Sequence, residues 1–315
     1  MTTSDPFPVL VRDRRRLADD IDEFTLARPD GALLPAWTPG AHIDLLLDDT
    51  VVRQYSLCSD PADTGTYRIA VLREADGRGG SVLAHTLAIG ADVSIRPPRN
   101  HFPLVRALEY VLIAGGVGIT PILALAAAAA RSGRPWRLIY TGRDASSMAY
   151  LDEVALRYPE AMIQQSASDG RLDLGASLAD LTPGTAVYVC GPTGLIEAAE
   201  LACEAQPAVD VFAERFVARD LDAAADTVPF EVSLAVSGLT ITVDPAGSIL
   251  AAVEAQGVAT VASCREGTCG TCETGVVSGE VDHRDSVLSP AERAESESMM
   301  ICVSRSASAR LVLEL

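Results

Sequence analysis

The chain has 315 residues, 48% of them hydrophobic, and a formal net charge of -18. A chain of this length can bury two or three cores of ordinary domain size, which excludes a single small binding module. All the basic residues are arginine, and the acidic excess should repel nucleic acid and anionic lipid. We therefore expect a protein partner to present a basic docking face.

The longest apolar run, residues 119–130, is shorter than the roughly 20 residues that span a bilayer, and no charged and then apolar leader opens the sequence. We therefore expect a cytoplasmic protein without a membrane anchor. The seven cysteines are an odd number for a disulfide framework. Cys58, Cys190 and Cys203 are accordingly expected as free thiols in a reducing compartment.

Residues 7–103 alternate short β-rich runs with turn residues, a spacing that predicts a small antiparallel barrel. The expected strands are 22–27, 42–47, 51–57, 67–72 and 92–96. One of them contains Arg53-Gln54-Tyr55-Ser56, in which Arg53 and Tyr55 should point to one face and Gln54 and Ser56 to the other.

A glycine-rich turn, Gly77-Arg78-Gly79-Gly80-Ser81, follows in the same region. Its amides, with Ser81 as a cap before a helix, would form a concavity that binds an anion. A solvated turn is the alternative interpretation. Together with residues 53–56, the turn predicts a barrel that holds a flavin phosphate.

From residue 109 onward, apolar runs alternate with helical segments, a pattern that favours a parallel sheet with helices on both faces. The expected strands are 110–114, 136–141, 162–166 and 186–190, and helices are expected after Pro121 and over 148–158 and 195–205.

The first of these strands leads into Gly115-Gly116-Val117-Gly118-Ile119-Thr120-Pro121. Glycines permit close backbone approach, and we expect Thr120 to cap a helix whose first turn holds Pro121. Free amides and the helix dipole would hold a pyrophosphate there. An ordinary strand-to-helix turn is the alternative.

A second glycine turn, Cys190-Gly191-Pro192-Thr193-Gly194, follows another apolar strand, so both turns should meet at the carboxyl edge of one sheet. Cys190 is expected there either as a buried thiol or as a small polarizable side chain against a nicotinamide ring. Arg143 could reach the adenosine ribose or lie on the surface. It leaves both NADH and NADPH open as the donor.

Residues 218–227, between Val217 and Val228, are polar and alanine-rich, which predicts a linker. Beyond it, 230–236 and 239–243 predict a hairpin turning at Ser237-Gly238, followed by a helix over 248–256. Ser289, Pro290 and Glu292 form a predicted capping box for one late helix.

Cys264, Cys269 and Cys272 have the spacing CxxxxCxxC, and Cys302 follows later. This is the ligand spacing of plant-type ferredoxins, which hold a 2Fe-2S cluster. Structural zinc sites usually pair two short knuckles, whereas Cys302 is solitary. The spacing therefore favours a 2Fe-2S cluster over zinc.

The order of these motifs resembles the phthalate dioxygenase reductase family, within the ferredoxin-NADP reductase-like superfamily, over nearly the whole chain. The matching elements are Arg53 to Ser56, Gly79 to Ser81, Gly115 to Pro121, Cys190 to Pro192, Glu214-Arg215-Phe216 and the four clustered cysteines.

The resemblance implies FMN rather than FAD, NADH as the donor, and a monomer. It also implies flavin contacts at Arg53, Tyr55, Ser56, Gly80 and Ser81. Phe216 would then pack near the isoalloxazine, although a core position is the commoner fate of a phenylalanine.

We accordingly expect an FMN-binding antiparallel β-barrel over 1–104, an NAD-binding α/β domain with a parallel sheet over 105–222, and a β-grasp-like plant-type ferredoxin domain over 228–315. The expected reaction-site residues are Cys190, Thr120 and Phe216. The expected cofactor contacts are Arg53, Gln54, Tyr55, Ser56, Gly79, Gly80, Ser81, Gly116, Gly118, Ile119, Thr120, Arg143, Gly191, Pro192 and Phe216. The expected metal ligands are Cys264, Cys269, Cys272 and Cys302.

The predicted function is that of the reductase component of a multicomponent oxygenase. It would pass electrons from NADH through FMN and the cluster to a terminal Rieske-type oxygenase or demethylase. A haem monooxygenase is the alternative acceptor. A reductase that releases free flavin would be expected to lack a tethered cluster, and an iron-sulfur redox sensor would need a DNA- or partner-responsive element that the acidic composition does not supply.

Overall fold

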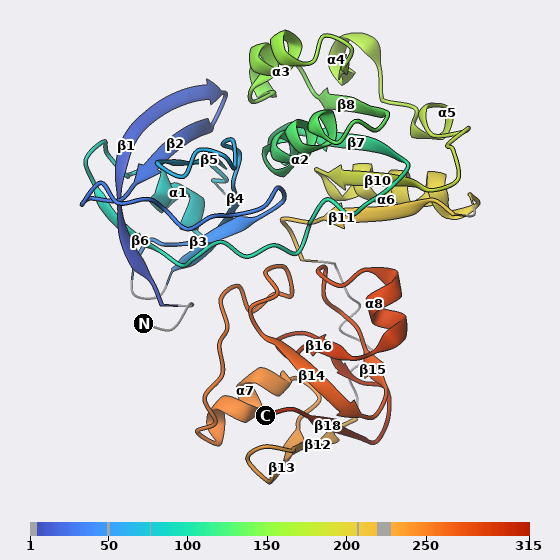
Figure 1. The fold of residues 1–315 in the computed structure, drawn as a ribbon. Coiled ribbons are helices and arrows are strands. Elements are labelled where there is room, and N and C mark those ends of the chain that lie inside the picture. Colours follow the sequence, from blue (N-terminus) through green and yellow to red (C-terminus); the bar gives the residue numbers. More distant parts are fainter. Residues whose placement is uncertain (1–4, 49–50, 76, 207, 219–227) are drawn as a thin grey trace. The chain divides into compact units, whose positions relative to one another are not determined.

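The computed structural model describes residues 5–48, 51–75, 77–206, 208–218 and 228–315. The chain divides into two compact units, Met1–Glu214 and Arg215–Leu315 (Figure 1). Most of the predicted linker, residues 219–227, lies outside the described residues.

The first unit opens with a six-stranded antiparallel sheet in the order β4-β3-β6-β1-β2-β5, which is the predicted barrel. Its core gathers Phe24, Ile43, Tyr67 and Ile95, all at most 1% exposed. Its elements are β1 (Phe7–Ala18), β2 (Ile21–Ala27), β3 (His42–Leu46), β4 (Val52–Ser56), β5 (Tyr67–Leu72), α1 (Gly80–Ala84) and β6 (Asp92–Ile95).

Strand β1 was not among the predicted strands. Its run of charged residues from Arg12 to Arg16 hides the alternation that reveals a strand. The charges are satisfied by acidic residues on the neighbouring strand β2, where Arg14 pairs with Asp22 at 2.6 Å and Arg15 with Glu23 at 2.9 Å. Such ion pairs between strands cannot be predicted until it is known which two strands are neighbours and in which register.

The same unit continues as a parallel sheet in the order β11-β10-β7-β8-β9. On one face Leu112 packs with Ile122 of helix α2, and on the other Val111 packs with Ile196 of helix α6, so helices cover both faces as predicted. The elements are β7 (Glu109–Gly115), η1 (Gly116–Gly118), α2 (Ile119–Arg131), β8 (Trp136–Gly142), η2 (Ala145–Ser147), α3 (Leu151–Arg157), β9 (Met162–Gln165), α4 (Ser166–Asp169), α5 (Leu174–Ser177), β10 (Thr185–Cys190), α6 (Thr193–Glu204) and β11 (Asp210–Glu214).

The second unit is a mixed five-stranded sheet in the order β13-β12-β18-β14-β16, with the small pair β15-β17 beside it. Ser248 caps α7 by accepting from the Ala251 amide, and Ser289 and Glu292 form the predicted capping box of α8. The elements are β12 (Phe230–Leu234), β13 (Leu239–Val243), α7 (Ile249–Ala255), β14 (Glu273–Ser278), β15 (Val281–Asp282), α8 (Pro290–Glu295), β16 (Ser298–Met300), β17 (Arg305–Ser306) and β18 (Arg310–Leu313).

Candidate functional site

The four clustered cysteines of the second unit are all buried, between 2% and 7% exposed. Three lie in the loop between α7 and β14, and Cys302 follows β16. Their sulfurs form two pairs in hydrogen-bond contact, Cys264 with Cys269 and Cys272 with Cys302. In the described part of the chain, no group of three or more His, Cys, Asp or Glu side chains is arranged to hold a single metal ion.

The backbone of this loop turns toward the sulfur of Cys264. The amides of Glu266 and Thr268 each donate to Cys264 Sγ at 3.4 Å. The hydrogen bond between the two sulfurs, together with these amides, lowers the pKa of the Cys264 thiol, and the same bond raises the pKa of Cys269. The loop therefore supplies buried cysteine sulfurs and amide donors that stabilise charge on sulfur, so these residues fit a 2Fe-2S cluster.

A buried carboxylate holds the loop in place, and the sequence offered no signal for it. Asp285 is 0% exposed and accepts from the amides of Val287 (2.9 Å) and Leu288 (2.8 Å). The neighbouring Ser286 amide donates to the carbonyl of Gly267 at 2.7 Å. A Cβ on Gly267 would stand 3.0 Å from the Asp285 backbone, so this close approach requires glycine.

In the barrel, β4 carries the predicted flavin motif next to the glycine turn. Arg53 donates to the carbonyl of Arg78 at 3.0 Å, and a Cβ on Gly80 would collide with the Arg53 side chain. Gln54 donates instead to the fully buried Asp44 at 2.9 Å. The guanidinium is thus held against a glycine-rich turn that leaves room for it at Gly80, which fits a phosphate of a flavin.

The helix that follows this turn is not capped by Ser81, contrary to our prediction. Helix α1 begins at Gly80 after Gly79, which has φ 77° and makes no side-chain cap. The Ser81 hydroxyl accepts from the Glu74 amide at 3.0 Å, so it fastens the turn to the chain after β5. The left-handed backbone at Gly79 explains the glycine there.

The two predicted glycine turns meet at the carboxyl ends of adjacent strands, β7 and β10. A Cβ on Gly118 would collide with the carbonyl of Cys190, and a Cβ on Gly191 would lie 2.9 Å from the Gly115 Cα. The helices after β7 and β10 cover opposite faces of the sheet. This is the switch point at which open α/β sheets bind ligands, so the geometry fits a dinucleotide.

Thr120 is not the cap of α2. The helix begins at Ile119 after the short η1 turn, with Gly118 at the cap position, and Pro121 lies in its first turn as predicted. The Thr120 side chain is 2% exposed and donates to the Val117 carbonyl at 3.0 Å. The prediction failed because the η1 turn places the start of the helix two residues earlier than a cap at Thr120 would.

The carboxyl ends of β10 and β11 bring two further groups together. Cys190 is directly opposite Glu214 in the parallel register and is fully buried. Ser56, at the end of the flavin strand β4, donates to Glu214 Oε2 at 3.3 Å. Burial raises the pKa of Glu214 to about 8, and burial with the nearby Glu214 charge raises the pKa of Cys190 well above its usual value.

Glu214 is a candidate site residue to which the sequence analysis gave no role. Glu214 was included there only as part of the Glu214-Arg215-Phe216 motif, and no role was assigned to its side chain. A signal was available, because Glu214 directly follows the apolar residues 211–213 of its strand, and an acidic side chain in such a place needs a polar partner. The structure joins it to Ser56 and Cys190, which come from two other segments of the chain.

Two other predicted contacts lie at the surface. The Arg143 side chain is 79% exposed and lies 4.0 Å from the Asp144 carboxylate. Phe216, which follows β11, is 45% exposed, so the alternative that it is a core aromatic is wrong. Its position beside the flavin stays a prediction.

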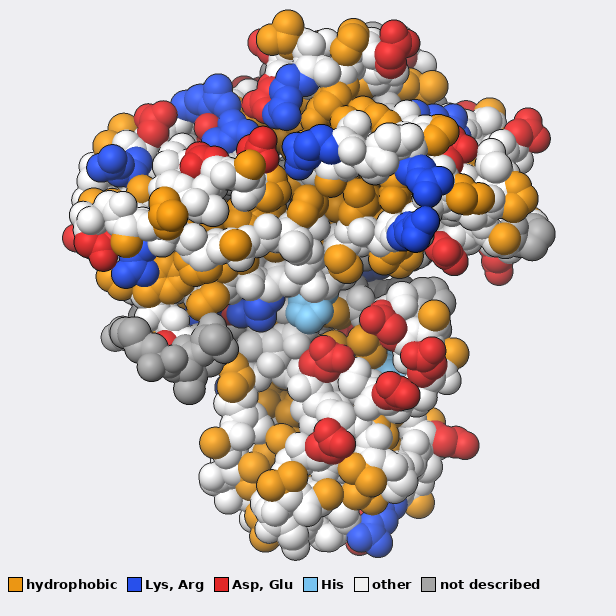
Figure 2. All heavy atoms as spheres, viewed as in Figure 1, with side chains coloured by type: hydrophobic (Ala, Val, Ile, Leu, Met, Phe, Trp, Pro, Cys, Tyr) orange, Lys and Arg blue, Asp and Glu red, His pale blue; other side chains and the backbone are white. Residues whose placement is uncertain are grey.

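The described residues contain no helix that is both long and apolar enough to cross a membrane. On the face seen in Figure 2, acidic side chains are scattered over the iron-sulfur unit. Within residues 228–315, acidic side chains outnumber arginines.

Family models match three successive segments of the chain. An oxidoreductase FAD-binding domain covers residues 8–103, an oxidoreductase NAD-binding domain covers 112–201, and a 2Fe-2S iron-sulfur cluster binding domain covers 233–307. All three kinds of binding unit that the motifs predicted are therefore present, in the predicted order.

The carnitine monooxygenase reductase subunit of Escherichia coli (strain K12) is 40% identical over 331 residues, covering 98% of each chain. The phenoxybenzoate dioxygenase subunit beta of Ectopseudomonas oleovorans is 42% identical, covering 95% of this chain and 94% of that one.

Two solved structures share the fold. Phthalate dioxygenase reductase matches with a TM-score of 0.71 and 36% identity over 98% of both chains. A type IV self-sufficient cytochrome P450 monooxygenase matches with a TM-score of 0.91 and 40% identity, and there 98% of this chain corresponds to 41% of the longer one. The chain therefore belongs to the phthalate dioxygenase reductase family and is an NAD(P)H-dependent oxidoreductase with flavin, nicotinamide and 2Fe-2S domains, of the reductase class that serves multicomponent oxygenases.

Proposed function

We propose that this reductase takes electrons from NADH, holds FMN as its flavin, and passes electrons through its 2Fe-2S cluster to a separate terminal oxygenase of the Rieske type. The observation that supports the proposal most strongly is that one chain contains both kinds of site. Ser56, Glu214 and Cys190 converge in the first unit, and four buried cysteines form two pairs in the second.

A flavin bound at β4 would supply the exchange between the two-electron chemistry of a nicotinamide and the one-electron chemistry of an iron-sulfur cluster. The chain's own task is to position the reacting rings and to exclude water from them. Arg53 and the Gly79-Gly80-Ser81 turn would hold the phosphate. We propose FMN rather than FAD because the order of the motifs resembles the phthalate dioxygenase reductase family, which implies FMN.

The nicotinamide nucleotide would lie across the two glycine turns. Gly116, Gly118 and Ile119 would receive its pyrophosphate at the start of α2, with Thr120 holding the turn through Val117. Gly191 and Pro192 would lie beside the nicotinamide and Cys190 beneath it. Arg143, exposed at the end of β8, would reach the adenosine ribose.

Glu214 would hold a proton near the reacting rings. With a pKa of about 8, its carboxyl is mostly protonated at neutral pH, and Ser56 connects it to the flavin strand. A neutral acid at this position can supply a proton to a ring that is being reduced without placing a negative charge beside it. We therefore assign Glu214 to the reaction site with Cys190.

Cys264 and Cys269 would bind one iron, and Cys272 and Cys302 the other, following the two sulfur pairs. The boundaries we propose for the three domains are 1–104, 105–222 and 228–315. We also propose that the chain acts as a monomer in the cytoplasm.

The acceptor we propose is a terminal oxygenase with a basic docking face, because the iron-sulfur domain carries an acidic excess. The names of the relatives support an oxygenase acceptor, since they are reductase subunits of carnitine and toluene-4-sulfonate monooxygenase systems and a subunit of a phenoxybenzoate dioxygenase. One observation favours a second candidate, a haem acceptor: the matching cytochrome P450 carries a similar reductase within its own chain.

The test is reconstitution with NADH, the purified reductase and two acceptors. Anaerobic NADH should first bleach flavin absorbance and then cluster absorbance. A Rieske-type oxygenase should be reduced at a rate that falls steeply with rising ionic strength, because attraction between an acidic and a basic face is screened by salt. Reduction of a P450 but of no Rieske-type protein would reassign the acceptor, and absence of both chromophores would overturn the proposal.

A further inference from the structure

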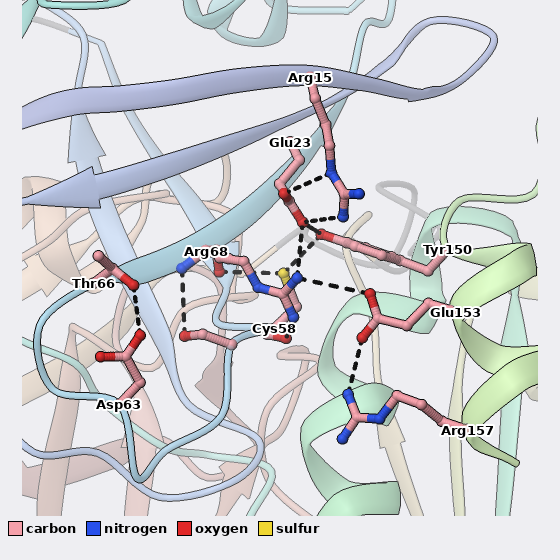
Figure 3. A network of polar contacts seen from close by, with 10 residues as sticks. Arg15, Glu23, Cys58, Asp63, Thr66, Arg68, Tyr150, Glu153 and Arg157 are labelled. Atoms are coloured by element: carbon pink, nitrogen blue, oxygen red, sulfur yellow. Dashed lines mark hydrogen bonds and ion pairs between the residues drawn. The ribbon is translucent and has the colours of Figure 1, made fainter.

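A buried polar network joins the flavin barrel to the nicotinamide sheet within the first unit (Figure 3). Its centre is Tyr150, the residue before helix α3, whose hydroxyl donates to Glu23 Oε2 at 2.7 Å and lies 3.1 Å from Cys58 Sγ. Glu23 belongs to β2, and Cys58 follows the flavin strand β4. We call Glu23, Cys58 and Tyr150 the Tyr150 bridge.

The acidic end of the bridge is firmly held on the barrel side. The Glu23 side chain is only 5% exposed. Arg15 donates two hydrogen bonds to it, from Nε to Oε1 at 2.9 Å and from Nη2 to Oε2 at 3.2 Å. Arg68 donates to Oε2 from the other side at 3.4 Å. A buried carboxylate with this many partners is fixed in position, so the hydrogen bond that it accepts also fixes the position of the Tyr150 hydroxyl.

Tyr150 is held against its own backbone preference. Its φ is 58°, the left-handed region that side chains other than glycine and asparagine seldom adopt. The side chain is buried among apolar residues of both halves, and the Arg68 guanidinium lies over its ring at 5.8 Å. Strain of this kind persists where surrounding contacts over-determine a conformation, which is common at functional sites.

The contacts of Tyr150 lead to both cofactor sites. On the flavin side, Cys58 is two residues beyond Ser56, the residue that binds Glu214. On the nicotinamide side, the carbonyl of the adjacent Ala149 accepts from the hydroxyl of the fully buried Tyr140 at 2.8 Å. The same Tyr140 hydroxyl lies 3.3 Å from the carbonyl of Gly116, in the glycine turn of the nucleotide site.

The thiol in the bridge has no chemical task of its own. Burial raises the pKa of Cys58 to about 12, so it remains a neutral thiol rather than a nucleophile. A second link lies beside the bridge, where the Asp19 amide donates to the Ser146 carbonyl at 2.6 Å. We therefore infer that this network fixes the position of the flavin barrel relative to the nicotinamide sheet.

We propose that Tyr150 is a positioning residue for hydride transfer: through Glu23 and Cys58 on one side and Tyr140 on the other, it sets the Gly116 turn relative to the flavin strand. This inference rests on the proposed transfer from NADH to a flavin in this unit. Reacting rings must meet at close range in the right orientation, and a misplacement of about 1 Å can cost on the order of 100-fold in rate.

Removal of the Tyr150 hydroxyl should therefore act on the chemical step and leave binding alone, because the glycine turns that hold the nucleotide are unchanged. For Tyr150→Phe we expect the limiting rate of flavin reduction at saturating NADH to fall about tenfold or more. The dissociation constants of NADH and FMN should stay within about twofold of the unchanged protein. The absorbance of the charge-transfer complex between the stacked rings should also weaken.

The matched control is Tyr158→Phe. Tyr158 lies seven residues beyond the start of the same helix, and its buried hydroxyl has no hydrogen-bond partner among the described residues. This substitution should leave the limiting rate and the charge-transfer absorbance unchanged. Glu23→Ala, which removes the acceptor of the Tyr150 hydroxyl, should lower the rate as Tyr150→Phe does. The double variant should lose less than the two single variants added together, because both remove the same interaction.

Equal limiting rates in Tyr150→Phe, Tyr158→Phe and the unchanged protein would overturn the inference. So would a rate loss that appears only where the thermal unfolding midpoint is also lowered below the assay temperature. If a core variant fails to fold, Arg15→Gln replaces it, because the Arg15 side chain is 52% exposed and its loss still removes two bonds to Glu23. An unchanged rate in that variant would equally count against the inference. Failure of the unchanged holoprotein to reduce its flavin with NADH would instead refute the proposed function.

Discussion

The Ser56 hydroxyl donates to Glu214 Oε2 at 3.3 Å and so joins the flavin strand to the last strand of the nicotinamide sheet. Glu214 also lies opposite Cys190 in the sheet register. Three side chains from separate segments thus converge at the place where we propose that the two rings meet. Four measurements test this site and the proposed cofactor sites.

The first concerns the proton on Glu214. Its pKa is raised from about 4.5 to about 8, so the carboxyl is protonated below pH 8 and becomes charged above it. We expect the rate of flavin reduction by NADH to fall as the pH rises through about 8, because the proton is lost and a negative charge appears beside the flavin. Stopped-flow measurement of flavin absorbance between pH 6 and 9.5 checks this.

In Glu214→Gln the same pH profile should be flat, with a lower rate at pH 7. The matched control is Glu204→Gln at the exposed end of α6, which should keep the profile of the unchanged protein. A Glu214→Gln variant that retains the fall near pH 8 would mean that another group titrates there.

The second prediction concerns flavin retention. Arg53→Ala should weaken FMN binding by about 1.5–3 kcal/mol, because a charge-assisted contact to phosphate is lost. Fluorescence titration of the flavin-free protein measures this as an increase in the dissociation constant of roughly 10- to 100-fold. Arg12→Ala, on the exposed part of β1, is the control and should bind FMN normally. Equal affinity in the two variants would place the phosphate elsewhere.

The third prediction separates the cluster from the flavin. Cys302→Ala should lose the cluster absorbance and the iron, yet its flavin should still be reduced by NADH, because the reaction site lies in the other unit. Electron transfer to an external oxygenase should stop. Cys203→Ala, a thiol of helix α6 outside both sites, should keep its iron. Loss of flavin reduction in Cys302→Ala would contradict the order of the two sites.

The fourth prediction uses the close approach of the two glycine turns. In Gly118→Ala the new methyl group would collide with the Cys190 carbonyl, which is backbone and cannot move aside cheaply. We expect the KM for NADH to rise by about tenfold or more, because the turns must separate. Gly194→Ala is the control in the same region, since its Cβ meets nothing within 4 Å. Steady-state kinetics with ferricyanide as acceptor would reveal the difference, and equal KM values would show that the turns are not the nucleotide site.

Much of this protein is determined locally in the sequence. The CxxxxCxxC spacing, the two glycine turns and the change from strand-type to helix-type periodicity each lie within a few residues, so they identified the three units and their order. The capping box at Ser289 was predicted for the same reason, since a cap depends on neighbours along the chain.

Predictions failed where the same local sequence pattern is compatible with more than one structure. Thr120 and Ser81 are good capping residues, but each follows a glycine turn that starts its helix earlier than the pattern suggests. Strand β1 was missed because its arginines are neutralised by acidic residues on the next strand, a relationship that exists only after the strands pair.

Only the tertiary structure decided which distant side chains meet. Ser56 and Glu214 are 158 positions apart, and Glu23 and Tyr150 are 127 apart. No periodicity or spacing records such contacts, because they depend on how strands and helices pack rather than on the order of residues along one element. The cofactor classes are therefore read from the sequence, whereas the proton-holding carboxyl and the Tyr150 bridge emerge from the fold.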